Sequence, residues 1–204
     1  MTNSLLAVIM ELEILLLTVV SLLSHANGAK YELSVADEDI FSSCNSPDPG
    51  TLDINGLMDL SELSTSMSAE GVTISGNATL IWDINLEDRV QMNTNLLYFD
   101  RGTWTPTAFS MVSKDFCKSM YDKNQYYYKY WTGYITNDIQ DKCINVPGTK
   151  IIHKTFTLSL TANVMGPLRE GTYKAQLMLR AYDATGIERP TRICLEIRGD
   201  LFKV

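Results

Sequence analysis

Apolar and polar residues alternate one by one along four long stretches of this chain, residues 71–86, 154–164, 172–182 and 191–201. Successive side chains of a β-strand point to opposite faces of a sheet, so this pattern predicts half-buried strands. Clusters rich in Gly, Pro, Asn and Asp separate the stretches, namely NSPDPG, VPGT, GPLREGT and DATG. We therefore predict an all-β fold, an antiparallel β-sandwich of immunoglobulin-like type with about six to nine strands.

The alternation also predicts which side chains face inward. The first stretch places Val72, Ile74, Ala78, Leu80, Trp82, Ile84 and Leu86 on one face, and the second places Phe156, Leu158 and Leu160 together. The third row contains Tyr173, Ala175, Leu177, Leu179 and Ala181, and the fourth contains Ile193, Leu195 and Ile197. Helical signal is weak, and only residues 110–124 predict one or two turns, with Phe116 and Met120 four residues apart.

Residues 4–23 are almost continuously apolar and are followed by small and polar residues. Ala26 and Gly28 fit the small-residue rule of a signal-peptidase site, which predicts cleavage before Ala29. We expect residues 1–28 to be a signal peptide and residues 29–204 to form a single secreted domain. An uncleaved membrane anchor is the alternative, but Glu11 and Glu13 would be costly within a bilayer.

The balance of charge argues against polyanionic partners. The chain has 17 basic and 24 acidic residues, a net charge of −7. Nucleic-acid binding needs a basic stripe, so we expect no nucleic-acid partner and no electrostatic attraction to anionic membranes.

Four cysteines, Cys44, Cys117, Cys143 and Cys194, include no C-x-x-C pair. Only His153 remains as a histidine after predicted cleavage, so we expect no metal site. An even number of cysteines behind a signal peptide predicts two disulfides, for which three pairings exist. The simplest arrangement nests one bridge inside the other.

Catalytic motifs are absent from the sequence. His153 has no recognisable nucleophile motif beside it, and no glycine-rich phosphate loop is found. The acidic run at residues 37–39 is typical of a solvated segment. We expect a non-enzymatic protein without a cofactor. Asn77, in the triplet Asn-Ala-Thr, is the one predicted N-glycosylation acceptor and lies on the outward face of its stretch.

The stretch NQYYYKYWTGY, residues 124–134, contains five of the ten tyrosines and lies between two cysteines. As a strand it would bury Tyr126, Tyr128 and Tyr130 and expose Tyr127 and Trp131. Tyr and Trp are also favoured where one end of the ring is dry and the other wet, as at a cavity mouth, and at protein interfaces. These three interpretations remain open from the residues alone.

Several short motifs, taken in order, resemble the ML lipid-recognition superfamily, in its ganglioside-activator-like branch, and most closely the insect chemosensory proteins of CheB type. They are FSSCN at 41–45, SGNATL at 75–80, Cys117 with Cys143, EGTYKAQLML at 170–179 and CLEIRGDL at 194–201. The activators' two additional disulfides are missing here, and the tyrosine run has no counterpart in the lysosomal members. These departures favour the CheB-type proteins.

The resemblance implies two sheets that enclose a hydrophobic cavity for a lipid chain. It also implies Cys44–Cys194 and Cys117–Cys143 pairing and places the tyrosine stretch near the cavity entrance. The side chains predicted to bind ligand are Leu80, Trp82, Ile84, Tyr128, Trp131, Tyr134, Phe156, Leu158, Leu177 and Leu179.

The expected function is secreted, non-enzymatic binding of a lipid, fatty-acyl or pheromone-like hydrocarbon, in chemosensory detection. The alternative is an extracellular interaction protein that uses residues 124–134 to bind a membrane receptor or another secreted protein. A third option, an enzyme built around His153, predicts turnover that is lost when this residue is replaced.

Overall fold

The computed structural model describes Glu11, Glu13, residues 28–45 and residues 48–204. The predicted signal peptide, except for Glu11, Glu13 and Gly28, therefore lies outside the described residues. Within the part of the chain that the structure describes, no helix is long and apolar enough to cross a membrane.

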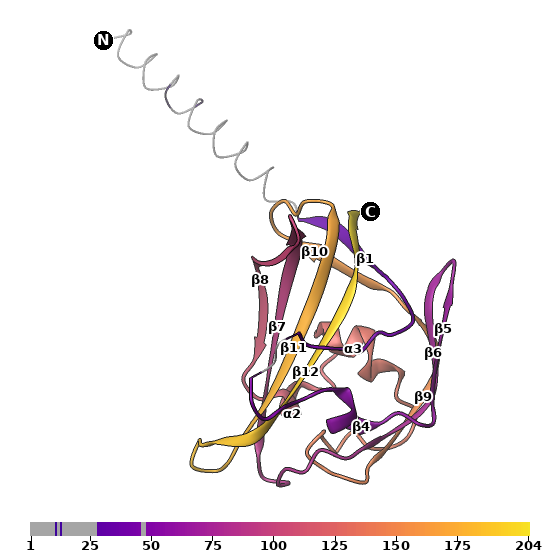
Figure 1. Cartoon of the computed structure of the whole chain (residues 1–204), viewed down its shortest axis with the longest axis vertical. Helices are drawn as coiled ribbons and strands as arrows, with labels where there is room; N and C mark the ends of the chain where they lie inside the picture. The colour runs from indigo at the N-terminus through magenta and orange to yellow at the C-terminus, as the bar shows by residue number, and fades with distance from the viewer. Residues whose placement is uncertain (1–10, 12, 14–27, 46–47) are drawn as a thin grey trace.

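Two antiparallel sheets form the body of the molecule, as the alternation predicts (Figure 1). The larger sheet has the order β10 (Leu160–Val164), β1 (Ala29–Val35), β12 (Glu188–Lys203), β11 (Gly171–Tyr182), β7 (Arg89–Asp100) and β8 (Thr103–Ser113). Two short strands, β2 (Ser42–Ser43) and β3 (Thr51–Leu52), also pair with β12, β3 in the parallel direction. This sheet curls into a half-barrel with β10 and β8 as its edges.

The smaller sheet is built around β6 (Gly71–Leu80). Strands β4 (Met58–Asp59) and β5 (Leu63–Ser68) pair with successive parts of β6, and β9 (Lys150–Leu158) also pairs with it. Gly76 allows the chain to pass close to a neighbouring segment, because a Cβ there would lie 2.2 Å from the Glu62 carbonyl oxygen. Its φ of +99° is also in the region that favours glycine.

The segments between strands contain two short α-helices and two 3₁₀ turns. They are η1 (Ile54–Gly56), α2 (Phe116–Ser119), α3 (Tyr126–Tyr130) and η2 (Thr132–Tyr134). Helix α2 confirms the helical turn predicted around Phe116, and the Asp115 carboxylate caps it by accepting from the Lys118 N–H. Nine strands have five or more residues in the described part of the chain, at the upper end of the predicted number.

Two of the predicted strands differ from the observed ones. The alternation in residues 71–86 predicted one strand, but β6 ends at Leu80 and Leu86 is 66% exposed. The chain leaves the sheet there in an irregular segment that still buries Trp82 and Ile84, and Trp82 Nε1 donates to Thr191 Oγ1 at 3.2 Å. The second predicted strand, residues 154–164, is broken at Ser159, where the chain passes from β9 in the smaller sheet to β10 in the larger one.

Two disulfides join Cys44 to Cys194 and Cys117 to Cys143, which confirms the nested pairing. The outer bridge joins Cys44, which follows β2, to Cys194 in β12. The inner disulfide, Cys117–Cys143, closes the loop that carries α3 and η2.

A buried ion pair lies on the face of β11 and β12 opposite the cavity-facing row. Lys174 Nζ donates to Glu196 Oε1 at 2.6 Å, and the two side chains are 5% and 0% exposed. Arg198 and Gln176 also donate to this carboxylate, and the Trp104 ring covers the Lys174 ammonium at 4.8 Å. Burial alone would raise the pKa of Glu196, but the hydrogen bonds from Lys174 and Arg198 lower it below its ordinary value.

Candidate functional site

A cavity of about 610 Å³ lies between the two sheets. The half-barrel contributes most of the wall, and Met58, Ile151 and Leu158 of the smaller sheet contribute to the opposite side. This volume is within the range of small-molecule sites in proteins, about 300–1,000 Å³.

The wall of the cavity is almost entirely apolar. Among the described residues that line it, no side chain is charged at neutral pH. The polar members are Tyr31, Thr94, Ser110, Tyr126, Tyr127, Tyr130, Thr132 and Asn163. Burying an ion without a partner is very costly, so this wall favours an uncharged molecule or an uncharged part of one.

Alternation along the strands builds the half-barrel side of the wall. Residues two apart point to the same face, so the central strands β7, β11 and β12 contribute side chains from alternate positions. The contributors are Met92, Thr94 and Leu96 of β7, Ala175, Leu177 and Leu179 of β11, and Leu195, Ile197 and Leu201 of β12. Leu177 lies at the centre, opposite Thr94 on one neighbouring strand and Leu195 on the other.

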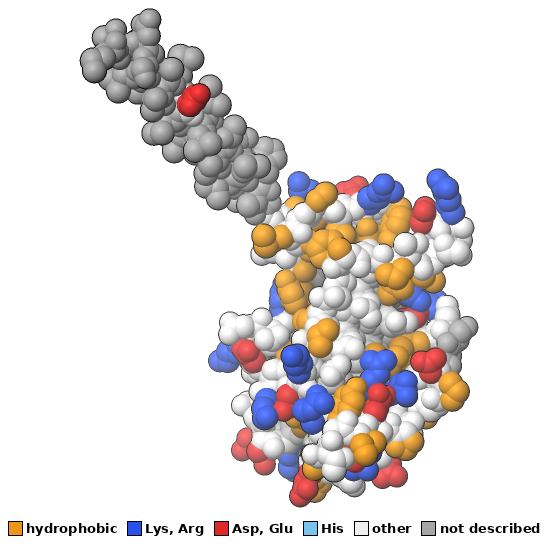
Figure 2. Space-filling view, turned by 90° about the vertical axis from the view of Figure 1, so that its left-hand side faces the viewer, with side chains coloured by type: hydrophobic (Ala, Val, Ile, Leu, Met, Phe, Trp, Pro, Cys, Tyr) orange, Lys and Arg blue, Asp and Glu red, His pale blue; other side chains and the backbone are white. Residues whose placement is uncertain are grey.

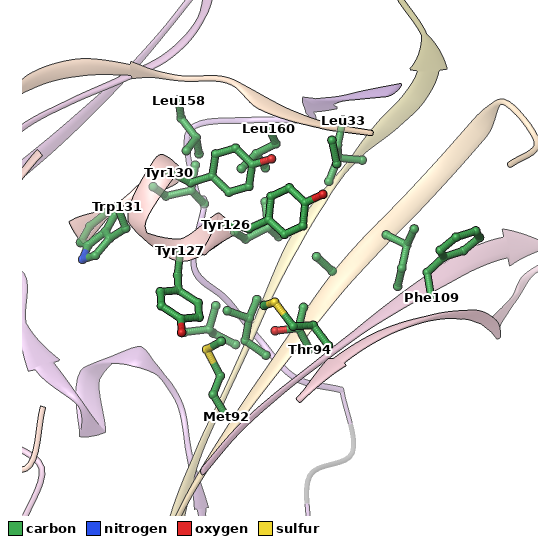
Figure 3. Close-up of a pocket in the computed structure, with 18 of the residues that line it drawn as sticks. Leu33, Met92, Thr94, Phe109, Tyr126, Tyr127, Tyr130, Trp131, Leu158 and Leu160 are labelled. Atoms are coloured by element: carbon green, nitrogen blue, oxygen red, sulfur yellow. The ribbon is translucent and has the colours of Figure 1, made fainter. Parts of the chain in front are cut away.

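The tyrosine stretch forms another side of the cavity, and it is a short helix rather than a strand. Helix α3 lies between the two sheets (Figure 1), so the predicted strand alternation of this stretch is wrong. Tyr126, Tyr127, Tyr130 and Trp131 all line the cavity. Figure 3 shows the rings of Tyr126 and Tyr130 on the side towards Leu33, and Tyr127 pointing towards Met92.

Side chains of α3 hold it against the unpaired edge of β10. The Tyr126 hydroxyl donates to the Asn163 carbonyl at 3.5 Å, and Lys129 Nζ donates to the Thr161 carbonyl at 2.8 Å. The Tyr130 hydroxyl also donates to the Thr161 carbonyl. Burial raises the pKa of Tyr130, so it remains a donor over the whole physiological range. These bonds satisfy edge carbonyls that no strand covers.

The other side of α3 packs against α2. The Tyr127 hydroxyl donates to Ser119 Oγ at 2.6 Å, and its ring lies edge-on to Phe116 with the centroids 5.0 Å apart. The inner disulfide ties α2 to the end of the same loop. Helix α3 is therefore fixed on both sides.

The cavity opens between the two edges of the half-barrel. Its most exposed lining residues are Ala108 and Ser110 of β8 on one side, and Tyr126, Asn163 and Met165 on the other. Met165, in the loop after β10, is 75% exposed. Figure 2 shows the face on the β8 side, where hydrophobic side chains gather in the upper half and charged ones are more frequent in the lower half.

The Trp131 ring packs against a cluster of rings formed by His153, Phe156 and Tyr134. Its ring centroid lies 4.5 Å from that of His153 and 6.2 Å from that of Phe156, and Tyr134 stacks on Phe156 at 3.8 Å. His153 is 6% exposed, and neither ring nitrogen has a hydrogen-bond partner among the described residues. Burial lowers the pKa of His153 to about 4, so the ring is neutral at physiological pH.

The predicted binding residues fall into two groups. Trp131, Leu158, Leu177 and Leu179 line the cavity. The others are not among the lining residues: Leu80, Trp82 and Ile84 are buried in the main hydrophobic core, Phe156 and Tyr134 belong to the ring cluster, and Tyr128 is half-buried beside Gly133.

Strands β7 and β8 both line the cavity and were not predicted in the sequence analysis, although β7 has an alternating pattern. Val90, Met92, Thr94, Leu96 and Tyr98 alternate with mostly polar residues, and this signal was available. The tyrosines of α3 have no comparable signal, because their direction depends on the contacts of α3 with β10 and α2.

The predicted glycosylation residue Asn77 lies on β6 and is half-buried. Its side-chain nitrogen donates to Glu62 Oε2 at 3.0 Å, and Lys150 Nζ pairs with the same oxygen at 2.6 Å. Both partners are partly exposed, so the amide lies in a polar group at the surface of the smaller sheet.

No protein-family model matches this chain, and no curated protein matches it at a significant level.

Proposed function

We propose that this protein is a non-enzymatic carrier that holds one hydrophobic small molecule in the cavity between its sheets. The observation that supports this most strongly is the cavity of about 610 Å³. Among the described residues that line it, none has a charged side chain. Val72, Ile74, Val90 and Ile193 are fully buried, so the sheets also have a core that excludes solvent.

Apolar burial is the main source of affinity in this proposal. Each methylene transferred from water to an apolar site contributes about 0.8 kcal/mol. An alkyl chain of about ten methylenes would gain about 8 kcal/mol, from which the cost of losing translational and rotational freedom is subtracted. Hydrocarbon length, rather than a charged headgroup, is therefore expected to set the affinity.

The resemblance to the ML superfamily and to CheB-type proteins supports a finer form of the proposal. In this form the protein is secreted, adopts the lipid-recognition sandwich, and binds a lipid or pheromone-like hydrocarbon in chemosensory detection. The two disulfides are compatible with an oxidising compartment.

Native mass spectrometry of the secreted, disulfide-intact protein tests the proposal. A discrete added mass that disappears on organic extraction, followed by identification of the extracted lipid, is the expected result. Displacement of a fluorescent hydrophobic probe by long-chain alkanes should then be saturable. No saturable binding of any long-chain lipid or hydrocarbon would refute the proposal, and the aromatic segment 124–134 would then be tested as a protein-binding surface.

A further inference from the structure

Thr94 is a polar residue in the middle of an apolar wall. On β7 it lies between Met92 and Leu96, which line the cavity with it. Across the sheet it is opposite Leu177 of β11 and Met111 of β8, which are also lining residues. Figure 3 shows Thr94 in the same part of the wall as Met92.

The hydroxyl of Thr94 has no hydrogen-bond partner among the described residues, although its oxygen is buried. The other buried hydroxyls of the wall differ, because each donates to a protein oxygen. Tyr31 donates to Leu168, Tyr127 to Ser119, Tyr130 to Thr161 and Thr132 to Met120.

A buried hydroxyl without a partner destabilises a protein relative to an apolar group of the same shape. Valine has nearly the shape of threonine and a high preference for strands, so it would fit this position without that cost. The hydroxyl of Thr94 is thus unfavourable for folding alone, and a ligand that bonds to it would remove the penalty.

We propose that Thr94 forms a hydrogen bond to an uncharged oxygen within the ligand, such as a carbonyl, ester or hydroxyl group. The inference rests on the proposed carrier function and narrows its ligand class. A threonine hydroxyl donates to a carbonyl oxygen or accepts from a ligand hydroxyl. A carboxylate at this depth would lack a cation, because no lining side chain in the described part of the chain is charged.

The position of Thr94 also sets where the oxygen lies in the ligand. Met92, Thr94 and Leu96 span about 14 Å of wall at about 3.4 Å per residue, with Thr94 at the midpoint. The oxygen function is therefore expected part-way along the hydrocarbon rather than at its end. Thr94 lines the cavity and is half-buried, but its hydroxyl oxygen is buried. The proposed bond therefore requires a change of rotamer about the Cα–Cβ bond that brings the hydroxyl to the cavity.

Two probes of equal chain length test this role, heptadecane and dioctyl ketone. Dissociation constants are measured by displacement of a fluorescent probe from the wild-type protein, Thr94→Val and Thr94→Ser. The ratio of the ketone constant to the alkane constant should rise about 3- to 10-fold in Thr94→Val, as expected for one lost neutral hydrogen bond. Thr94→Ser keeps the hydroxyl and should leave the ratio within about twofold of the wild-type value.

Thr149→Val is the matched control. Thr149 is also buried with an unpartnered hydroxyl, but it does not line the cavity. This variant should leave the ratio unchanged, and both valine variants should unfold at or above the wild-type temperature. If Thr94→Val binds both probes and the ratio is unchanged, the proposed role of Thr94 is wrong but the carrier function still stands. Failure of the wild-type protein to bind either probe would overturn the proposed function as well.

Discussion

His153 should make the stability of this protein fall in mild acid, and His153→Phe should remove that effect. In the folded protein the ring is buried against Trp131 and Phe156, and neither nitrogen is hydrogen-bonded among the described residues. Phenylalanine keeps a ring of similar size in these contacts but does not titrate. The two proteins therefore differ mainly in whether a proton can bind at this position.

The magnitude follows from the pKa of His153. Burial lowers it from 6.5 to about 4, so the unfolded chain takes up the proton at higher pH than the folded protein does. The stability due to the neutral ring is fully present above the pKa that His153 has in the unfolded chain. It is lost as the pH falls towards the pKa that His153 has in the folded protein. At about 1.4 kcal/mol per pKa unit, the loss is about 2 kcal/mol between about pH 7 and pH 5, and about 3 kcal/mol below about pH 4.

Urea unfolding at about pH 7, 6 and 5 measures this loss as a change in the free energy of unfolding. Carboxylates that titrate in the same range affect both proteins equally, so the difference between their pH profiles isolates His153. The wild-type protein should lose about 2 kcal/mol more than His153→Phe over this range. Parallel profiles would refute the reasoning, because they would mean that the ring reaches water or finds a partner when it is protonated.

Three further predictions concern the cavity, the buried ion pair and the inner disulfide. Leu177→Trp places a larger side chain in the cavity and should weaken the binding of a fluorescent hydrophobic probe at least about tenfold. Leu86→Trp, at an exposed position, is the control and should leave probe binding unchanged. Glu196→Gln leaves the buried Lys174 ammonium without its counter-ion and should lower the free energy of unfolding, measured in urea, by about 3–5 kcal/mol. A double variant that also replaces Lys174 with Met should recover part of this loss. Replacing both cysteines of the inner disulfide with Ser should lower the free energy of unfolding by about 3 kcal/mol. It should also increase hydrogen exchange in residues 118–142. Unchanged exchange there would show that the side-chain contacts of α3 are sufficient to keep this loop folded.

Two central strands of the half-barrel, β11 and β12, are predictable from the sequence. Alternation in residues 172–182 and 191–201 predicts β11 and β12, and it predicts that Leu177, Leu179, Leu195 and Ile197 share the inner face. This success has a simple physical cause, because the period of two is a local property of any extended chain with one buried face.

The same rule fails where the chain bends or where other contacts override local preference. Ser159 lets the chain change sheets although the alternation continues through it. The tyrosines of residues 126–130 favour strands by propensity, yet they form α3, because bonds from Tyr126, Lys129 and Tyr130 to the β10 edge outweigh that preference.

By itself, the sequence predicted the strand faces of β11 and β12, the short helix at Phe116 and the nested disulfides as the simplest of three pairings. Only the tertiary structure decided that the inner faces enclose a cavity, because an inward row looks the same in sequence whether it fills a core or lines a space. It also decided that Lys174 and Glu196, on the outward row of their strands, are buried. Their long side chains and the Trp104 ring cover each other, and a pattern of alternation contains no information about such contacts between strands.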